Sequence, residues 1–122
     1  MKRVLVAGGG GFIGSNLIGE LLSRGHVVTC LDNFSTGSIE NIHRYLANPN
    51  FTLLNEELLD FDPETLEPHD EIYHLASPAS PPKYLALAEE TIMVNTAGTM
   101  ILVAAAESWS ARLLFASTSE VY

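Results

Sequence analysis

The most constraining feature of this sequence is a glycine-rich turn that follows a short apolar run near the N-terminus. The apolar residues 4–7 lead into five glycines between positions 8 and 14, and a helical apolar pattern then begins. A strand, a glycine turn and a helix in that order form a setting in which a turn can bind phosphate, although glycine-rich turns also occur as linkers. Gly8 suits a tight turn, Gly11 permits close approach to a pyrophosphate, and Gly14 allows the helix to pack against the strand.

An acidic residue follows the second apolar run at the distance expected of a ribose-binding carboxylate. Asp32 ends the run 27–31, about 20 residues after the glycines. The helix N-terminus, where unpaired N–H groups and the positive end of the dipole point outward, would receive the anion. The Asp32 carboxylate would repel a 2′-phosphate, and no Lys or Arg occurs in residues 33–37. The pattern therefore predicts nucleotide binding, with NAD favoured over NADP.

Strands and helices alternate along the chain. The expected strands are rich in Val, Ile, Leu and Phe with little alternation, as parallel strands buried on both faces are. They cover residues 3–7, 27–31, 51–54, 71–75 and 113–116, and the expected helices cover 12–24, 38–46 and about 82–109. Right-handed crossovers then predict an α/β fold, a doubly wound, Rossmann-like parallel sheet with strand order 3-2-1-4-5, in one domain over residues 1–122. Ligands bind such sheets outside the carboxyl ends of the strands.

Composition bears on partners and location. Fifteen acidic against six basic residues give a net charge of −9, which disfavours nucleic acid and anionic membranes. No apolar run approaches the roughly 18 residues of a membrane span. The apolar stretch after Met1 is too short for a signal peptide, so we expect a cytoplasmic protein.

Cysteine and histidine residues suggest structural positions. The single cysteine, Cys30, excludes an internal disulfide and lies in a buried-strand pattern, so we predict a core residue. His74 occupies a similar pattern and is predicted to be a hydrogen-bonded core residue. The other three, His26, His43 and His69, are assigned to turns or a helix surface. Their spacing predicts no metal site.

Three blocks of the sequence resemble a known family. The Gly-x-x-Gly-x-x-Gly spacing of the turn, with Phe12 and Ile13 inside it, is similar to that of extended short-chain dehydrogenases/reductases, which act largely on nucleotide sugars. The proline-rich block 74–82, with Tyr84, and the block 116–122 resemble those of the UDP-glucuronate decarboxylases within that family.

The resemblance implies an NAD site at the ends of the strands. Asp60 and Phe61 would meet the adenine ring, and residues 75–77 would run along the nicotinamide side. Asp60 could equally be an ordinary acid in a solvated acidic connection, and Asn95 could simply face water. The implied cofactor contacts are Gly8, Gly11, Phe12, Ile13, Gly14, Asp32, Asn33, Ser35, Thr36, Asp60, Phe61, Leu75, Ala76, Ser77, Asn95 and Ser117.

The resemblance also implies a reaction. Thr118 would hydrogen-bond the sugar hydroxyl that is oxidised, and Glu120 would lie near C4–C5 of the sugar. The Tyr-x-x-x-Lys pair and the substrate domain are expected beyond Tyr122, so we expect this chain to be inactive alone. The complete enzyme would convert UDP-glucuronate into UDP-xylose by C4 oxidation, decarboxylation and re-reduction. An NDP-sugar 4-epimerase or 4,6-dehydratase, or a non-catalytic nucleotide-binding module, stays open.

The last expected helix points to self-association. From Ala86 to Trp109 it is apolar around much of its circumference, so it must bury more than one face. In the resembled family the outer face of this helix joins a dimer interface. We therefore expect a homodimer or a larger assembly through this helix.

Overall fold

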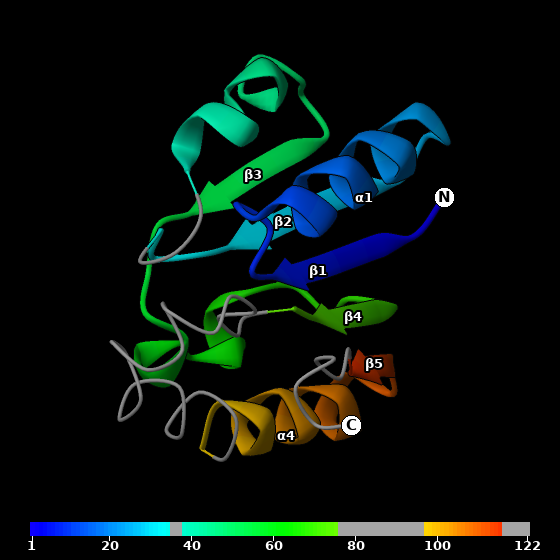
Figure 1. The fold of residues 1–122 in the computed structure, drawn as a ribbon. Helices are drawn as coiled ribbons and strands as arrows, with labels where there is room; N and C mark the ends of the chain where they lie inside the picture. The colour runs from blue at the N-terminus through cyan, green and yellow to red at the C-terminus, as the bar shows by residue number, and fades with distance from the viewer. Residues whose placement is uncertain (35–37, 76–96, 116–122) are drawn as a thin grey trace, which may run out of the picture.

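The computed structural model describes residues 1–34, 38–75 and 97–115, which form a five-stranded parallel sheet with helices on both faces (Figure 1). The strand order is β3-β2-β1-β4-β5. This order confirms the predicted doubly wound sheet. Three boundaries differ by one residue, since β4 ends at His74 and β5 covers Arg112–Phe115. The strands are β1 (Arg3–Ala7), β2 (Val27–Leu31), β3 (Phe51–Leu54), β4 (Glu71–His74) and β5 (Arg112–Phe115).

The register brings the carboxyl ends of all five strands to one level. Ala7, the last residue of β1, lies opposite Leu31 of β2 and His74 of β4. Leu31 in turn lies opposite Leu54, and His74 lies opposite Phe115. The segments that leave these strands therefore begin at the same edge of the sheet.

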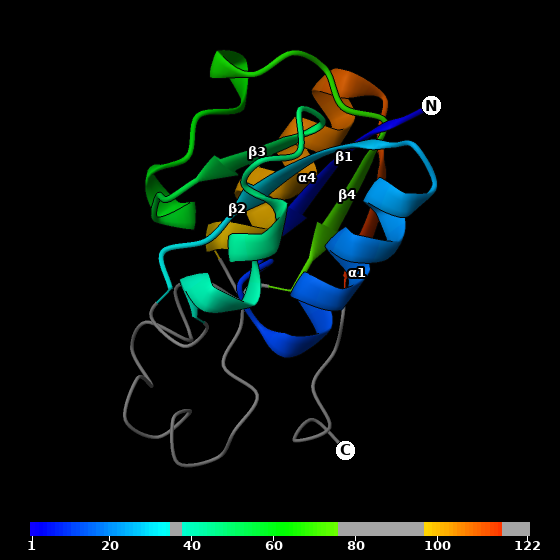
Figure 2. The ribbon, with the colours of Figure 1, turned by 90° about the horizontal axis from the view of Figure 1, so that it is seen from above.

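The central strand is buried on both faces. Val4 and Val6 of β1 pack with Ile18 of α1 (Phe12–Ser23), whereas Leu5 packs with Leu102 of α4 (Thr99–Trp109) on the opposite face. Figure 2 shows the two helices on either side of the sheet. Burial on both faces explains the apolar run of β1 without polar alternation.

The first helix ends at the glycine that the sequence indicates. Arg24 is the C-cap, and Gly25 adopts a left-handed conformation with φ of 83°. The Gly25 N–H donates to the Leu22 carbonyl at 3.0 Å, and the His26 N–H donates to the Leu21 carbonyl at 3.1 Å. This pair of hydrogen bonds is a Schellman motif, which satisfies two carbonyls at the helix end.

The helix predicted over residues 38–46 is wrong. Two 3-10 helices, η1 (Ile39–Asn41) and η2 (His43–Tyr45), occupy this segment. Their backbone hydrogen bonds span three residues rather than four, as from the Tyr45 N–H to the Ile42 carbonyl at 2.9 Å. A nine-residue helix is marginal by itself, and contacts of this segment with the glycine turn determine its conformation instead.

The acidic segment after β3 is more than a solvated connection. It contains η3 (Leu58–Asp60) and η4 (Pro63–Thr65), and Leu58 and Phe61 are buried in the core beneath α4. His69, near its end, is only 5% exposed, so its assignment to a turn or a helix surface is wrong. The segment packs across one face of the sheet because it carries its own apolar side chains.

Only the C-terminal part of the long helix expected over 82–109 falls within the described residues. This part is α4, which buries Leu102, Ala105 and Ala106. Met100 and Val103 are exposed on it. None of the helices in the described ranges is both long and apolar enough to cross a membrane.

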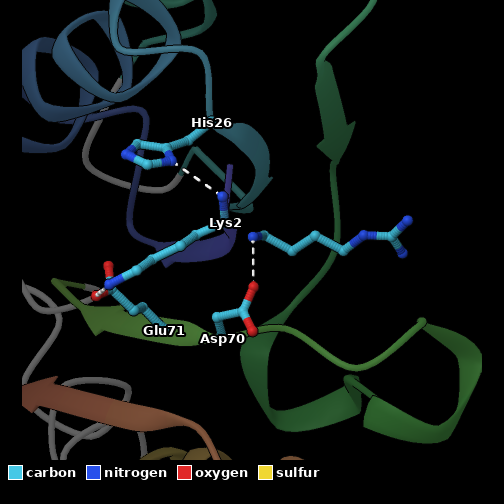
Figure 3. A network of polar contacts seen from close by, with 5 residues as sticks. Lys2, His26, Asp70 and Glu71 are labelled. Carbon is cyan, nitrogen blue, oxygen red and sulfur yellow. Dashed lines mark hydrogen bonds and ion pairs between the residues drawn. The ribbon is translucent and has the colours of Figure 1, made fainter.

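A network of polar side chains surrounds the amino ends of β1 and β4 (Figure 3). Lys2 Nζ lies 3.0 Å from Glu71 Oε2, and the Lys2 N–H donates to His26 Nδ1 at 3.0 Å. The Arg3 N–H donates to Asp70 Oδ2 at 2.8 Å, and the Arg3 guanidinium pairs with Glu67. These contacts fix the first strand at the edge opposite the glycine turn.

Candidate functional site

The glycine turn connects β1 to α1 at the carboxyl edge of the sheet. Gly8 has φ of 89°, and its N–H donates to the Leu31 carbonyl at 2.8 Å. A Cβ at Gly14 would lie 2.5 Å from the Gly8 carbonyl oxygen and 2.8 Å from Gly9 Cα. Because these atoms are backbone, only glycine lets the helix begin so close to the turn. At Gly11 the nearest atom would lie 3.8 Å away, so the surface there is open.

The N-terminus of α1 has the features of an anion site. Gly11 is its N-cap, with no capping side chain and no acidic residue in the first turn. The first intrahelical bond is donated by Ser15 to the Gly11 carbonyl at 2.9 Å, so the N–H groups of Phe12, Ile13 and Gly14 precede the helical ladder. The Phe12 and Ile13 side chains are 81% and 72% exposed. These N–H groups, together with the helix dipole, can bind phosphate oxygens.

Asp32 lies beside the turn at the end of β2. Its Oδ2 accepts from the Gly10 N–H at 2.7 Å, and its Oδ1 accepts from the Phe34 N–H at 2.7 Å. Phe34 adopts φ of 59°, which is uncommon for a residue with a side chain. A carboxylate has about four acceptor sites, so two backbone bonds leave Asp32 able to accept from two hydroxyl groups.

The sequence analysis missed a second carboxylate at this edge. Glu57, which follows β3, accepts a hydrogen bond at Oε2 from the Asn33 side-chain amide at 2.5 Å. The acidic segment that contains Glu57 is visible in the sequence, whereas the family resemblance points to Asp60. Asp60 is exposed, whereas the Phe61 side chain is 5% exposed within the core.

Two residues predicted to be structural are confirmed as such. His74 is 1% exposed, its Nε2 lies 3.2 Å from Thr99 Oγ1, and its ring meets the Phe115 ring edge-on. Cys30 is fully buried, and burial, with a smaller contribution from the Asp32 charge, raises the pKa of its thiol to about 12. A thiol with such a pKa is not a nucleophile at neutral pH.

The remaining predicted site residues are described only in part. Leu75 directly follows β4 and donates its N–H to the Ala7 carbonyl at 2.7 Å. Among the described residues, no three of the His, Cys, Asp or Glu side chains are grouped so that they could hold a metal ion. The predicted site residues that lie outside the described ranges are Ser35, Thr36, Ala76, Ser77, Asn95, Ser117, Thr118 and Glu120.

Comparison with known proteins identifies the family. Residues 4–122 match the model of the NAD dependent epimerase/dehydratase family. The chain belongs to this family. UDP-glucuronic acid decarboxylase 1 of Danio rerio is 47% identical over 121 residues, which are 99% of this chain and 28% of that protein. UDP-glucuronic acid decarboxylase 2 of Arabidopsis thaliana is 45% identical over 98% of this chain and 26% of its own length. The chain thus spans little more than a quarter of these relatives.

Solved structures of the family share the fold. A UDP-N-acetylglucosamine 4-epimerase from Methanobrevibacter ruminantium, in complex with UDP-N-acetylmuramic acid, aligns with a TM-score of 0.86 and 34% identity over 99% of this chain and 39% of its own. A UDP-glucose 4-epimerase from Thermus thermophilus, in complex with NAD, aligns with a TM-score of 0.75 and 33% identity over 95% of this chain and 37% of its own. This epimerase/dehydratase chain therefore has the fold of the N-terminal parts of family enzymes.

Proposed function

We propose that this chain binds NAD at the glycine turn and forms the cofactor-binding part of a UDP-glucuronate decarboxylase. The observation that carries the proposal is the identity of about 45% to UDP-glucuronic acid decarboxylases along nearly the whole chain. This identity exceeds the 34% and 33% shared with the two 4-epimerases. The decarboxylase is therefore favoured over the epimerase, which stays the alternative together with a 4,6-dehydratase.

The geometry of the turn supports NAD as the cofactor. The pyrophosphate would be held by the N–H groups of residues 12–14, and Gly11 would leave the main chain open to its approach. Asp32 would accept hydrogen bonds from the adenosine ribose hydroxyls. A 2′-phosphate would meet two carboxylates there, those of Asp32 and Glu57, so we expect NADP to bind weakly.

The chemistry of the complete enzyme rests on residues beyond the described ranges. When bound, NAD supplies an acceptor and later a donor of hydride at the sugar C4. In our proposal Thr118 orients the C4 hydroxyl by a hydrogen bond, and Glu120 lies near C4–C5. The Gly8–Gly14 turn and Asp32 fix the other end of the cofactor.

Calorimetric titration of the chain with NAD and NADP tests the cofactor. We expect saturable NAD binding, weaker NADP binding and no UDP-xylose from UDP-glucuronate. Preferred binding of NADP, or UDP-xylose formation by the chain alone, would contradict the proposal. Product analysis of the full-length enzyme separates decarboxylase, epimerase and dehydratase, since only the first releases CO₂ and UDP-xylose. NAD binding without any such activity would favour a non-catalytic module.

We further propose that the chain self-associates through α4. Met100 is 73% exposed and Val103 is 38% exposed on this helix, and Phe115 of the neighbouring β5 is 48% exposed. Met100→Glu should lower the mass measured by light scattering, whereas Asn50→Glu adds the same charge at a remote exposed position and should not. A monomeric unaltered chain at tens of micromolar would contradict this proposal.

A further inference from the structure

The segment from Ser38 to Tyr45, which contains η1 and η2, contacts the glycine turn and α1 through defined polar groups. The Gly10 carbonyl accepts two hydrogen bonds, one from the Asn41 side-chain amide at 2.8 Å and one from the Ser38 N–H at 3.1 Å. The other end of this segment donates the Tyr45 hydroxyl to the Ser15 carbonyl at 2.9 Å. The segment therefore spans the turn and the first part of the helix.

The fit of Tyr45 against α1 depends on glycine. A Cβ at Gly19 would lie 2.4 Å from the Tyr45 hydroxyl oxygen, so the absence of a side chain there makes room for the ring. Ile42, between the two polar anchors, is fully buried in the core on this face. The segment is thus held in place at three points, and its position relative to the turn is well defined.

The N–H and the carbonyl of Gly10 both form hydrogen bonds with other segments of the chain. Its N–H donates to Asp32 Oδ2 at 2.7 Å, while its carbonyl accepts from Asn41 and Ser38. In a planar trans peptide the C=O and the N–H point in opposite directions. Hydrogen bonds that fix the Gly10 carbonyl therefore also fix the direction of the Gly11 N–H. That N–H faces the Gly8 carbonyl at 3.4 Å and closes the turn. The Asn41 side chain therefore acts on the peptide that leads into the N-cap of α1.

We propose that Asn41 is a positioning residue for the cofactor pyrophosphate. It orients the Gly10–Gly11 peptide and thereby directs the free N–H groups of residues 12–14 toward the phosphates. Asn41 is itself exposed, so its role is to fix the turn rather than to fill the core. The inference rests on the proposed NAD site and adds a residue from a segment outside the glycine motif.

Ligands with and without phosphate distinguish a role of Asn41 in phosphate positioning from a role in the stability of the fold. We expect Asn41→Ala to weaken binding of NAD and ADP about fivefold, the loss expected of one neutral hydrogen bond. Binding of adenosine, which has no phosphate, should change little in a titration followed by NMR. The matched control is Asn48→Ala, because the Asn48 side chain also hydrogen-bonds the backbone: its Oδ1 accepts from the Asn50 N–H at 2.8 Å, away from the turn.

A second readout tests the positioning without any ligand. Asn41→Ala should shift the backbone amide resonances of Gly11, Phe12 and Ile13 in the free protein, and Asn48→Ala should leave them unchanged. Unchanged NAD affinity in Asn41→Ala, an equal loss for adenosine, or unshifted amides would overturn the inference. If the unaltered chain binds neither NAD nor ADP, the proposed function fails, and the ligand-free amides still decide whether Asn41 orients the turn.

Discussion

The two ends of the sheet satisfy their polar groups in different ways. At the amino end, charged side chains pair with one another, as in the pairs of Lys2 with Glu71 and Arg3 with Glu67. At the carboxyl end, the carboxylates of Asp32 and Glu57 accept from backbone or amide N–H groups, and no ion pair occurs there among the described residues. At the amino end the charges of these side chains thus neutralise one another, while at the carboxyl end backbone N–H groups stay available to a ligand.

Under the function proposed above, the difference explains how an acidic chain would bind an anionic cofactor. With a net charge of −9, long-range electrostatics oppose binding. Short-range donors at a helix N-terminus act within the first turn and do not require a positive net charge. The comparison therefore predicts that changes at the carboxyl end alter ligand binding, whereas changes at the amino end alter stability alone.

The largest effect is expected within the glycine turn. Gly14→Ala places a methyl group 2.5 Å from the Gly8 carbonyl oxygen, so α1 must move away, at a cost of about 2–3 kcal/mol in the free energy of unfolding. Gly11→Ala meets nothing closer than 3.8 Å and should leave stability nearly unchanged while weakening NAD binding. Urea denaturation and calorimetry measure both. Equal stability of the two variants would contradict the described packing.

Asp32→Asn should weaken NAD binding about tenfold and reduce the preference for NAD over NADP. The amide cannot accept from both the Gly10 and Phe34 N–H groups, and the charge that repels a 2′-phosphate is lost. Asp62→Asn is a matched control, because Asp62 Oδ1 also accepts from the N–H two residues on, that of Glu64 at 3.0 Å. Titrations of both variants with NAD and NADP check this. An Asp32→Asn variant that rejects NADP as strongly as before would refute the role of the charge.

A smaller, pH-dependent effect is expected from His69. Its Nδ1 lies 2.7 Å from the Glu67 carbonyl oxygen, which can only accept, so Nδ1 carries the proton and Nε2 accepts from the Thr29 hydroxyl at 2.9 Å. Burial, aided by the charge of Arg3, lowers the pKa of His69 below its ordinary 6.5. As the pH falls below 6.5, His69 therefore takes up a proton more readily in the unfolded chain than in the folded one. The stability that neutral His69 contributes is complete above pH 6.5 and is lost as the pH falls.

Urea denaturation at pH 7.5 and pH 5.0 measures the His69 contribution. His69→Gln should lower stability at pH 7.5 and reduce its loss between the two pH values. His43→Gln, at an exposed position, should keep the full loss. A pH dependence in His69→Gln as large as that of the unaltered chain would assign the effect to other groups.

The smallest effect is expected at the ion pair of the amino end. The Lys2 side chain is 52% exposed, so Lys2→Gln should lower the free energy of unfolding by less than about 1 kcal/mol, and less still at high salt. NAD affinity should not change. A loss of NAD affinity comparable to that of Asp32→Asn would break the distinction between the two ends.

Sequence reasoning succeeded where local pattern and burial agree. The strands were predicted to within one residue, because burial on both faces gives short apolar runs bounded by polar segments, as for Val27–Leu31. The turn at Gly8 and the helix end at Gly25 followed from the need for positive φ. In both cases the information lies in neighbouring residues.

Prediction from the sequence failed where contacts between residues far apart in the chain determine the structure. The expected helix over 38–46 is replaced by 3-10 turns, whose Asn41 side chain bonds to Gly10, 31 residues away. Glu57 was overlooked because its contact with Asn33 becomes visible only when β2 and β3 are aligned. His69 was misassigned because its burial depends on stacking against Trp109, which lies in α4. None of these contacts has a local signature.

The central claim, that the carboxyl end of the sheet binds the dinucleotide through its backbone, is tested most directly by NMR of the isotope-labelled chain titrated with NAD. The account predicts saturable shifts of the backbone amides of Gly11, Phe12 and Ile13, with those of Lys2 and Asp70 at the amino end unaffected. Shifts confined to the amino end, or no saturable shift at the glycine turn, would contradict it.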